Sequence, residues 1–188
     1  ESHLDQINPM DILCCTFVWN VFDFGSDGRY EAQVGGINNK GLVSFDRTVK
    51  KDSFYLYKAN WSSQPTVHLN SSRFTYRERD QIVVKGYSNC ESVSLYVNGE
   101  LVGALQQNDL DQETVFVWED VSLSGGKNTV KLVGTLDGKE YTDQAEWYYI
   151  KVDSPVYTVR DNTRTLVLPP LQTRIETMAD DITCNVDA

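Results

Sequence analysis

The feature that most constrains the fold of this 188-residue chain is a series of short segments in which apolar and polar residues alternate. In one of them Val93, Leu95 and Val97 fall on one face of an extended strand, and the residues between them fall on the other. Asn98-Gly99 and Asp137-Gly138 are two-residue hairpin signals. The expected strands are Thr66–Asn70, Gln81–Tyr87, Ser92–Asn98, Leu101–Gln106, Glu113–Glu119, Asn128–Gly134 and Lys139–Lys151. Short strands with turns at roughly 8–12-residue spacing predict an immunoglobulin-like β-sandwich over residues 63–151.

The first 62 residues follow another pattern. An almost continuous apolar run ends at Phe24, which predicts a strand over residues 12–24 that is covered on both faces. Glycines and polar residues over 25–44 predict a long loop, and apolar residues at helical spacing predict a helix at about 50–61. The polar segment 62–65 ends in a proline and predicts a linker to the sandwich. Residues 152–188 are interpreted as a linker, a tail or the start of a further domain.

Composition excludes some classes of partner. The chain has 17 basic and 27 acidic residues and a formal net charge of −10, which argues against nucleic acid and anionic membranes as partners. No segment approaches the roughly 20 apolar residues of a membrane span. We expect no cofactor and no metal, since His3 and His68 are isolated and the cysteines have no ligand spacing. The cysteines are expected to be buried free thiols: Cys14, Cys15, Cys90 and Cys184.

Three motifs resemble one enzyme family. They are Phe-Val-Trp-Asn-Val-Phe-Asp-Phe at 17–24, Gly-Ile-Asn-Asn-Lys-Gly-Leu-Val-Ser-Phe-Asp-Arg at 36–47, and Lys-Lys-Asp-Ser-Phe-Tyr-Leu-Tyr-Lys-Ala-Asn-Trp at 50–61. In this order and spacing they resemble the end of the catalytic barrel of glycoside hydrolase family 2, which includes β-galactosidases, β-glucuronidases and β-mannosidases. A weaker match continues through residues 88–99. The resemblance implies that residues 1–62 are the last βα unit of a truncated (β/α)₈ barrel, because a complete barrel needs about 250 residues.

The resemblance also implies an activity for a parent protein. Retaining glycosidases use two carboxyl groups about 5–5.5 Å apart. In the family these glutamates lie upstream of the motifs found here, and Glu1 lacks the surroundings of a nucleophile. The parent is expected to be a retaining exo-β-glycosidase of carbohydrate metabolism, of β-galactosidase or β-glucuronidase type, acting on a β-linked oligosaccharide or glycoside. This chain alone is expected to be inactive.

Four residues are candidates for one wall of the sugar pocket. Trp19 offers a flat apolar face for a pyranose ring, with a core tryptophan as the alternative. Asn38 and Lys40 resemble the Asn-x-Lys pair with which β-glucuronidases hold the sugar carboxylate, although Ile37 departs from that pattern and a solvated lysine is the alternative. Asp23 either accepts hydrogen bonds from sugar hydroxyls or caps the following turn.

Two other classes of function stay open at this point. One is a stand-alone β-sandwich that binds glycan or protein through residues such as Trp118 and Trp147. The other is an architectural module that supports a barrel or a homo-oligomer, with association through residues 12–24, since an unpaired strand promotes association. The sequence does not fix the cellular location, and the resemblance suggests a periplasmic or secreted bacterial parent.

Overall fold

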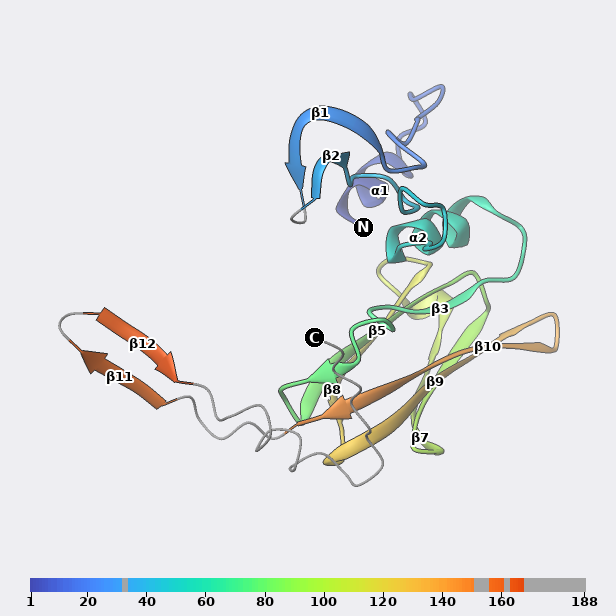
Figure 1. Ribbon diagram of the computed structural model, residues 1–188. Helices are drawn as coiled ribbons and strands as arrows, with labels where there is room; N and C mark the ends of the chain where they lie inside the picture. Colours follow the sequence, from blue (N-terminus) through green and yellow to red (C-terminus); the bar gives the residue numbers. More distant parts are fainter. Residues whose placement is uncertain (32–33, 151–155, 161–162, 168–188) are drawn as a thin grey trace.

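The central unit of the protein is a β-sandwich, seen in the computed structural model as two stacked sheets (Figure 1). The structure describes residues 1–31, 34–150, 156–160 and 163–167. One sheet has the strand order β4-β10-β9-β6-β7 and the other has the order β3-β5-β8. The strands are β3 (Val67–Leu69), β4 (Tyr76–Arg77), β5 (Gln81–Ser88), β6 (Ser92–Val97), β7 (Glu100–Gln106), β8 (Val115–Ser122), β9 (Gly126–Leu136) and β10 (Lys139–Tyr149). The prediction of a mainly β fold with a β-sandwich is confirmed.

The register follows from the alternation in the sequence. In β6, Val93, Leu95 and Val97 are buried, and Leu95 pairs with Leu132 of the neighbouring strand β9. Asn98 and Asp137 have φ values of 53° and 50°, and a glycine with positive φ follows each of them. These are the backbone conformations that tight hairpins require, so both predicted hairpins form.

The core lies between the two sheets. Phe116 of β8 and Val84 of β5 meet Leu95, Leu132 and Trp147 of the opposite sheet, and all five are buried. The buried thiol of Cys90 lies against Gly134, where an added Cβ would come within 2.8 Å of its sulfur. Cys90 is therefore buried as expected, whereas Cys14 and Cys15 are exposed, contrary to the prediction. Cys184 lies outside the described residues.

The N-terminal segment differs from its prediction. Helix α2 (Asp52–Trp61) forms where a helix was expected, and a short helix α1 (Ser2–Ile7) precedes it in the chain. The predicted strand over 12–24 is wrong: only Phe22 makes a strand-like bridge, parallel to Val43, and β1 begins at Phe24. A strand needs hydrogen-bonding partners along its edges, and among the described residues only the short segment around Val43 provides one.

The predicted loop over 25–44 contains a second difference. It carries a hairpin of β1 (Phe24–Glu31) and β2 (Val34–Asn38), which pair antiparallel with an irregularity in register. In Figure 1 this hairpin lies away from the sandwich, and α2 lies beside the sandwich. The two-residue periodicity is weak in this glycine-rich stretch, so the pattern did not reveal the strands.

A small apolar cluster joins the helices to the sandwich. Leu4 of α1 and Leu56 and Ala59 of α2 pack against Tyr87 and Val115 of the sandwich. The side chain of Asn60 also donates a 2.8 Å hydrogen bond to the Thr114 hydroxyl. Helix α2 is thereby held to β5 and to the start of β8.

Residues beyond the sandwich are described only in part. Strands β11 (Val156–Arg160) and β12 (Thr163–Val167) form an antiparallel hairpin, and the rest of the 152–188 interpretation lies outside the described residues. Within the described part of the chain, no helix has both the length and the apolar character needed to cross a membrane.

Candidate functional site

The candidate site is built where the apolar run meets the segment after β2. The backbone of Asp23 donates to the carbonyl of Val43 at 2.9 Å, and the backbone of Val43 donates to the carbonyl of Val21 at 2.9 Å. The backbone of Leu42 donates to the carbonyl of Asn20 at 3.1 Å. This short parallel pairing brings residues 20–23 beside the segment that ends at Val43. Residues 38–42 of that segment include the candidate sugar ligands Asn38 and Lys40 and are here called the sugar-site loop.

Asp23 is the anchor of this loop. Its side chain is buried, with 5% of the residue exposed. Its Oδ1 accepts hydrogen bonds from the Gly41 backbone N–H at 2.8 Å and from the Lys51 ammonium at 2.7 Å. The same ammonium donates to the carbonyl of Asn39 at 2.6 Å. The carboxylate that the sequence offered as a sugar ligand or a turn cap is therefore engaged in holding the loop.

Lys51 is a residue that the sequence reasoning missed. It lies 28 positions after Asp23, and nothing in the local pattern around the start of a helix distinguishes it from the exposed Lys50 beside it. The parallel bridge between Phe22 and Val43, together with the antiparallel bridge between Val43 and Lys50, brings the two charges together.

Gly41 permits the close approach of the two segments. A Cβ at this position would lie 2.2 Å from both the Phe22 carbonyl carbon and the Asp23 nitrogen. Backbone atoms cannot yield as a flexible side chain can, so the loop accepts only glycine at this point.

Asn38 and Lys40 lie on this anchored loop. Asn38 is buried, with 8% of the residue exposed, and its Oδ1 accepts a 3.1 Å hydrogen bond from the Lys40 backbone N–H. The resulting turn fixes the backbone of Lys40, which is exposed. The loop thus presents a cation at the surface from a backbone that is fixed on both sides.

Trp19 is exposed on the same part of the molecule. It is 81% exposed, so it is not packed in the core of the described part of the chain. Its ring meets the ring of Phe24 edge to face, with centroids 6.3 Å apart, and Phe24 is the cross-strand partner of Asn38. Trp19 and the sugar-site loop therefore lie on neighbouring positions of one surface.

The side-chain oxygen of Asn20 is buried beside this surface. It has no hydrogen-bond partner among the residues that the structure describes. The guanidinium of Arg47 donates to the carbonyls of Asp23 at 3.1 Å and Phe45 at 2.7 Å. Its guanidinium also lies 4.2 Å from the Phe22 ring centroid, so Arg47 helps to fix residues 22 and 23, which pair with the sugar-site loop segment.

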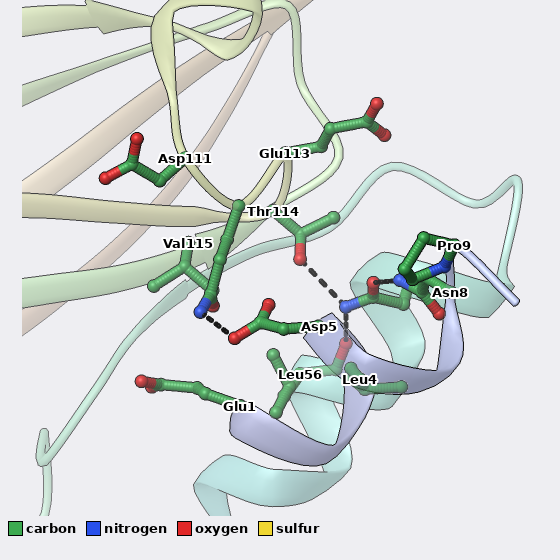
Figure 2. Close-up of a pocket in the computed structure, with 12 residues that line it drawn as sticks. Glu1, Leu4, Asp5, Asn8, Pro9, Leu56, Asp111, Glu113, Thr114 and Val115 are labelled. Atoms are coloured by element: carbon green, nitrogen blue, oxygen red, sulfur yellow. Dashed lines mark hydrogen bonds between the residues drawn. The ribbon is translucent and has the colours of Figure 1, made fainter.

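A cavity of about 620 Å³ lies elsewhere, between α1, α2 and the segment before β8 (Figure 2). None of the four candidate residues lines it. The side-chain amide of Asn60 donates to the Thr114 hydroxyl, and that of Gln112 donates to the Asp5 carboxylate. The cavity is a crevice between the helices and the sandwich, and no cluster of potential metal ligands is found in the described part of the chain.

His68 is not isolated, contrary to the expectation from spacing. Its Nε2 lies 3.0 Å from Asp52 Oδ1 at the start of α2, and its Nδ1 lies 3.4 Å from Asp143 Oδ2 on β10. Its ring stacks on Tyr55 with centroids 3.8 Å apart. The partners are 16 and 75 positions away, too far apart for a local pattern to reveal.

Comparison with known proteins finds that this chain is similar to part of longer proteins. A family model described as "Domain of unknown function (DUF4982)" matches residues 80–142, within the sandwich. The β-glucuronidase of Bacteroides fragilis is 40% identical over 142 residues, which are 75% of this chain and 20% of that protein. This chain therefore spans about a fifth of the length of that relative.

Two solved structures also match most of this chain over only a small part of their own length. The FMN-binding β-glucuronidase of Faecalibacterium prausnitzii L2-6 is 39% identical with a TM-score of 0.63, over 73% of this chain and 20% of that one. The β-glucuronidase of Parabacteroides merdae is 28% identical with a TM-score of 0.72, over 81% of this chain and 20% of that one. The similarity extends well beyond the residues of the family model, so it includes part of the N-terminal segment as well as the sandwich.

Proposed function

Since this chain is a fragment of the glycoside hydrolase family 2 type, we propose that it supplies one wall of the sugar pocket of a retaining exo-β-glycosidase, together with the sandwich behind it. The catalytic glutamates belong to the part of the enzyme that precedes this segment. Residues 1–62 are assigned to the end of the barrel, 63–151 to the sandwich, and 152–188 to a connection or a further domain.

The exposure of Trp19 beside the anchored loop is the observation that carries this proposal. A large aromatic side chain that is 81% exposed, next to a loop fixed by buried hydrogen bonds, is suited to stacking against a pyranose ring. Lys40 supplies a cation and Asn38 a directional amide at the edge of that platform. Asp23 acts as a positioning residue, because its Oδ1 is engaged by Gly41 and Lys51.

A β-glucuronide is the substrate class that this chemistry favours. A loop cation pairs with a carboxylate, which a glucuronide has and a galactoside lacks. The relatives compared above are named β-glucuronidases, in agreement with this choice.

The exposed apolar run is the surface that we expect the rest of the barrel to cover in the whole enzyme. Ile12 and Phe17 are about nine-tenths exposed, and Val21 and Phe22 are also exposed. Burial of such side chains against neighbouring strands would stabilise the assembly by about 1.5–3 kcal/mol each. The run is therefore proposed to complete its strand pairing within the whole enzyme.

A chimera tests the proposal. The matching segment of the Bacteroides fragilis β-glucuronidase is replaced by this chain, and hydrolysis of aryl β-glucuronides and β-galactosides is measured. We expect glucuronide turnover by the chimera, and we expect Lys40→Met to lower kcat/KM for the glucuronide by about 10–100-fold, the loss of one charge-assisted bond. Lys127→Met, on the sandwich surface, is the matched control and should leave turnover unchanged. Equal activity of the Lys40 variant, or turnover by the isolated 188-residue chain, would contradict the proposal.

The alternative of a stand-alone glycan-binding sandwich has less support. Trp118 and Trp147, the aromatic residues considered for such a face, are buried in the core between the sheets. They are therefore not available to stack on a ligand.

A further inference from the structure

The chain of contacts that holds the sugar-site loop begins inside the sandwich. His68, on β3, is buried between two carboxylates from two other elements, Asp52 of α2 and Asp143 of β10. A protonated imidazole donates from both ring nitrogens and satisfies both carboxylates, whereas the neutral ring keeps only one N–H. The position therefore favours the charged form of His68.

Asp52 carries this link to helix α2. It is the first residue of α2, and its Oδ2 also accepts a 2.8 Å hydrogen bond from the Ser71 backbone N–H. Both of its oxygens are thus engaged by the sandwich side, which fixes the first turn of the helix at a defined place.

Lys51 is the residue just before that turn. Its backbone donates to the carbonyl of Leu42 at 2.8 Å, and its ammonium bonds to Asp23 and to the Asn39 carbonyl. Asp23 in turn holds the Gly41 N–H. Every step from His68 to the loop is a hydrogen bond, an ion pair or a peptide bond.

We propose that His68, a residue of the sandwich, positions the loop that carries Asn38 and Lys40. The sandwich then determines where the sugar-site loop lies, although His68 itself is not a residue of the proposed sugar pocket. This inference rests on the proposed function of the loop and extends it to a residue that does not touch the sugar.

The link has a defined dependence on pH. The groups facing His68 are Asp52 and Tyr55 on α2, Asp143 on β10, and its cross-strand partner Tyr87 on β5, with Arg73 acting on Asp52. Burial lowers the pKa of His68, but the hydrogen bonds to Asp143 and Asp52 together raise it by more than burial lowers it. The net pKa is therefore above its ordinary value. The link is complete below about pH 6.5 and weakens as pH rises through the folded-state pKa.

Amide hydrogen exchange of the full 188-residue chain tests the proposal without any sugar. Exchange at the Gly41 N–H is measured by NMR between pH 5 and pH 8.5 and corrected for intrinsic rates, with the Leu132 N–H of β9 as the reference for the sandwich. We expect protection of Gly41 to fall with rising pH, by up to about tenfold for each unit by which the pKa of His68 is raised, while protection of Leu132 changes less.

Variants separate positioning from general stability. His68→Gln should lower Gly41 protection at pH 5.5 and remove its pH dependence, and His3→Gln, at the other histidine, should leave both unchanged. Val84→Ala, a sandwich core variant, should lower Leu132 protection without removing the pH dependence at Gly41. If His68→Gln does not fold, Asp143→Asn provides the same comparison with the histidine retained.

Two results would overturn the proposal. One is Gly41 protection that does not respond to pH or to His68→Gln. The other is an equal loss at Gly41 and Leu132 in that variant, which would make His68 a general stabiliser. If the link is found but the chimera does not cleave glucuronides, the proposed function fails and the positioning link stands.

Discussion

The ammonium of Lys51 lies 2.7 Å from Oδ1 of Asp23, and this ion pair ties the start of α2 to the end of the exposed apolar run. The carboxylate is almost fully buried, and the lysine side chain is about one quarter exposed. The pair stands between the sandwich and the candidate sugar site, so its loss should affect both the stability of the N-terminal segment and the shape of the loop.

Replacing Lys51 by methionine should destabilise the sugar-site loop. The Asp23 carboxylate would stay buried with the hydrogen bond from the Gly41 N–H but without its counter-charge, and such a buried charged group costs about 1–3 kcal/mol or more. Urea unfolding followed by tryptophan fluorescence measures the loss. Lys127→Met removes an exposed pair with Glu146 and should cost less than about 1 kcal/mol. Similar losses of unfolding free energy in the two variants would show that the buried pair at Asp23 contributes no more stability than an exposed pair.

Gly41→Ala should also be destabilising. Its Cβ would meet backbone atoms of Phe22 and Asp23, and overpacking of this kind costs about 1–3 kcal/mol. Gly125→Ala is the control, because nothing lies within 4 Å of a Cβ there. Thermal unfolding of the two variants should show a lower Tm only for Gly41→Ala, and an unchanged Tm would mean that residues 22 and 41 do not approach as closely as described.

The two aromatic residues Phe116 and Phe17 should respond in opposite ways. Phe116 is fully buried between the sheets, and Phe116→Ala should cost about 3–5 kcal/mol. Phe17 is 89% exposed, so Phe17→Ala should leave the unfolding free energy of the isolated chain within about 0.5 kcal/mol of wild type. Chemical denaturation measures both, and a large loss for Phe17→Ala would place the apolar run in the core of this chain.

The exposed run should also govern association. Ile12, Phe17 and Val21 together form exposed apolar surface that the whole enzyme is proposed to cover. The isolated chain is expected to self-associate at high concentration, and a variant with Ile12→Ser and Phe17→Ser should shift it toward monomer. Sedimentation velocity measures this shift, and a wild-type chain that stays monomeric throughout would contradict the expectation.

The sandwich could be predicted because its information is local. Alternation around Val93 and the turn residues Asn98 and Asp137 determine strands and hairpins within a few residues. The same local pattern predicts a strand over the apolar run up to Phe24, but a strand also needs partners, and the described chain supplies only the bridge to Val43.

The candidate site was predictable only in part. Trp19, Asn38 and Lys40 follow from motifs that resemble the family, whereas the contacts that hold them involve Lys51 and His68, which are distant in sequence. Such contacts depend on how elements pack, and no spacing in a single sequence encodes them.

Stability should depend on pH through the cluster at His68. The raised pKa of His68 makes its contribution complete below about pH 6.5, and the contribution is lost as pH rises through the folded-state pKa. Asp52 and Asp143 have lowered pKa values. The hydrogen bond from His68 is the main cause of the lowered pKa of Asp52. For Asp143, burial raises the pKa, but the hydrogen bonds from His68 and from the Leu69 backbone together lower it by more. Their contributions are present above about pH 3.8 and are lost as pH falls through their folded-state pKa values.

The excess stability of wild type over His68→Gln should therefore be largest between about pH 4 and pH 6.5. Urea unfolding at a series of pH values measures it. A difference that grows steadily above pH 7 would have the wrong sign for a charged His68.

The close packing of Cys90 against Gly134 provides a chemical reporter of sandwich opening. A thiol that is fully buried beneath a strand backbone cannot meet an alkylating reagent until the two sheets separate, whereas Cys14 and Cys15 are exposed from the start. The rate at which Cys90 is labelled would thus time the opening of the sandwich, without any introduced probe.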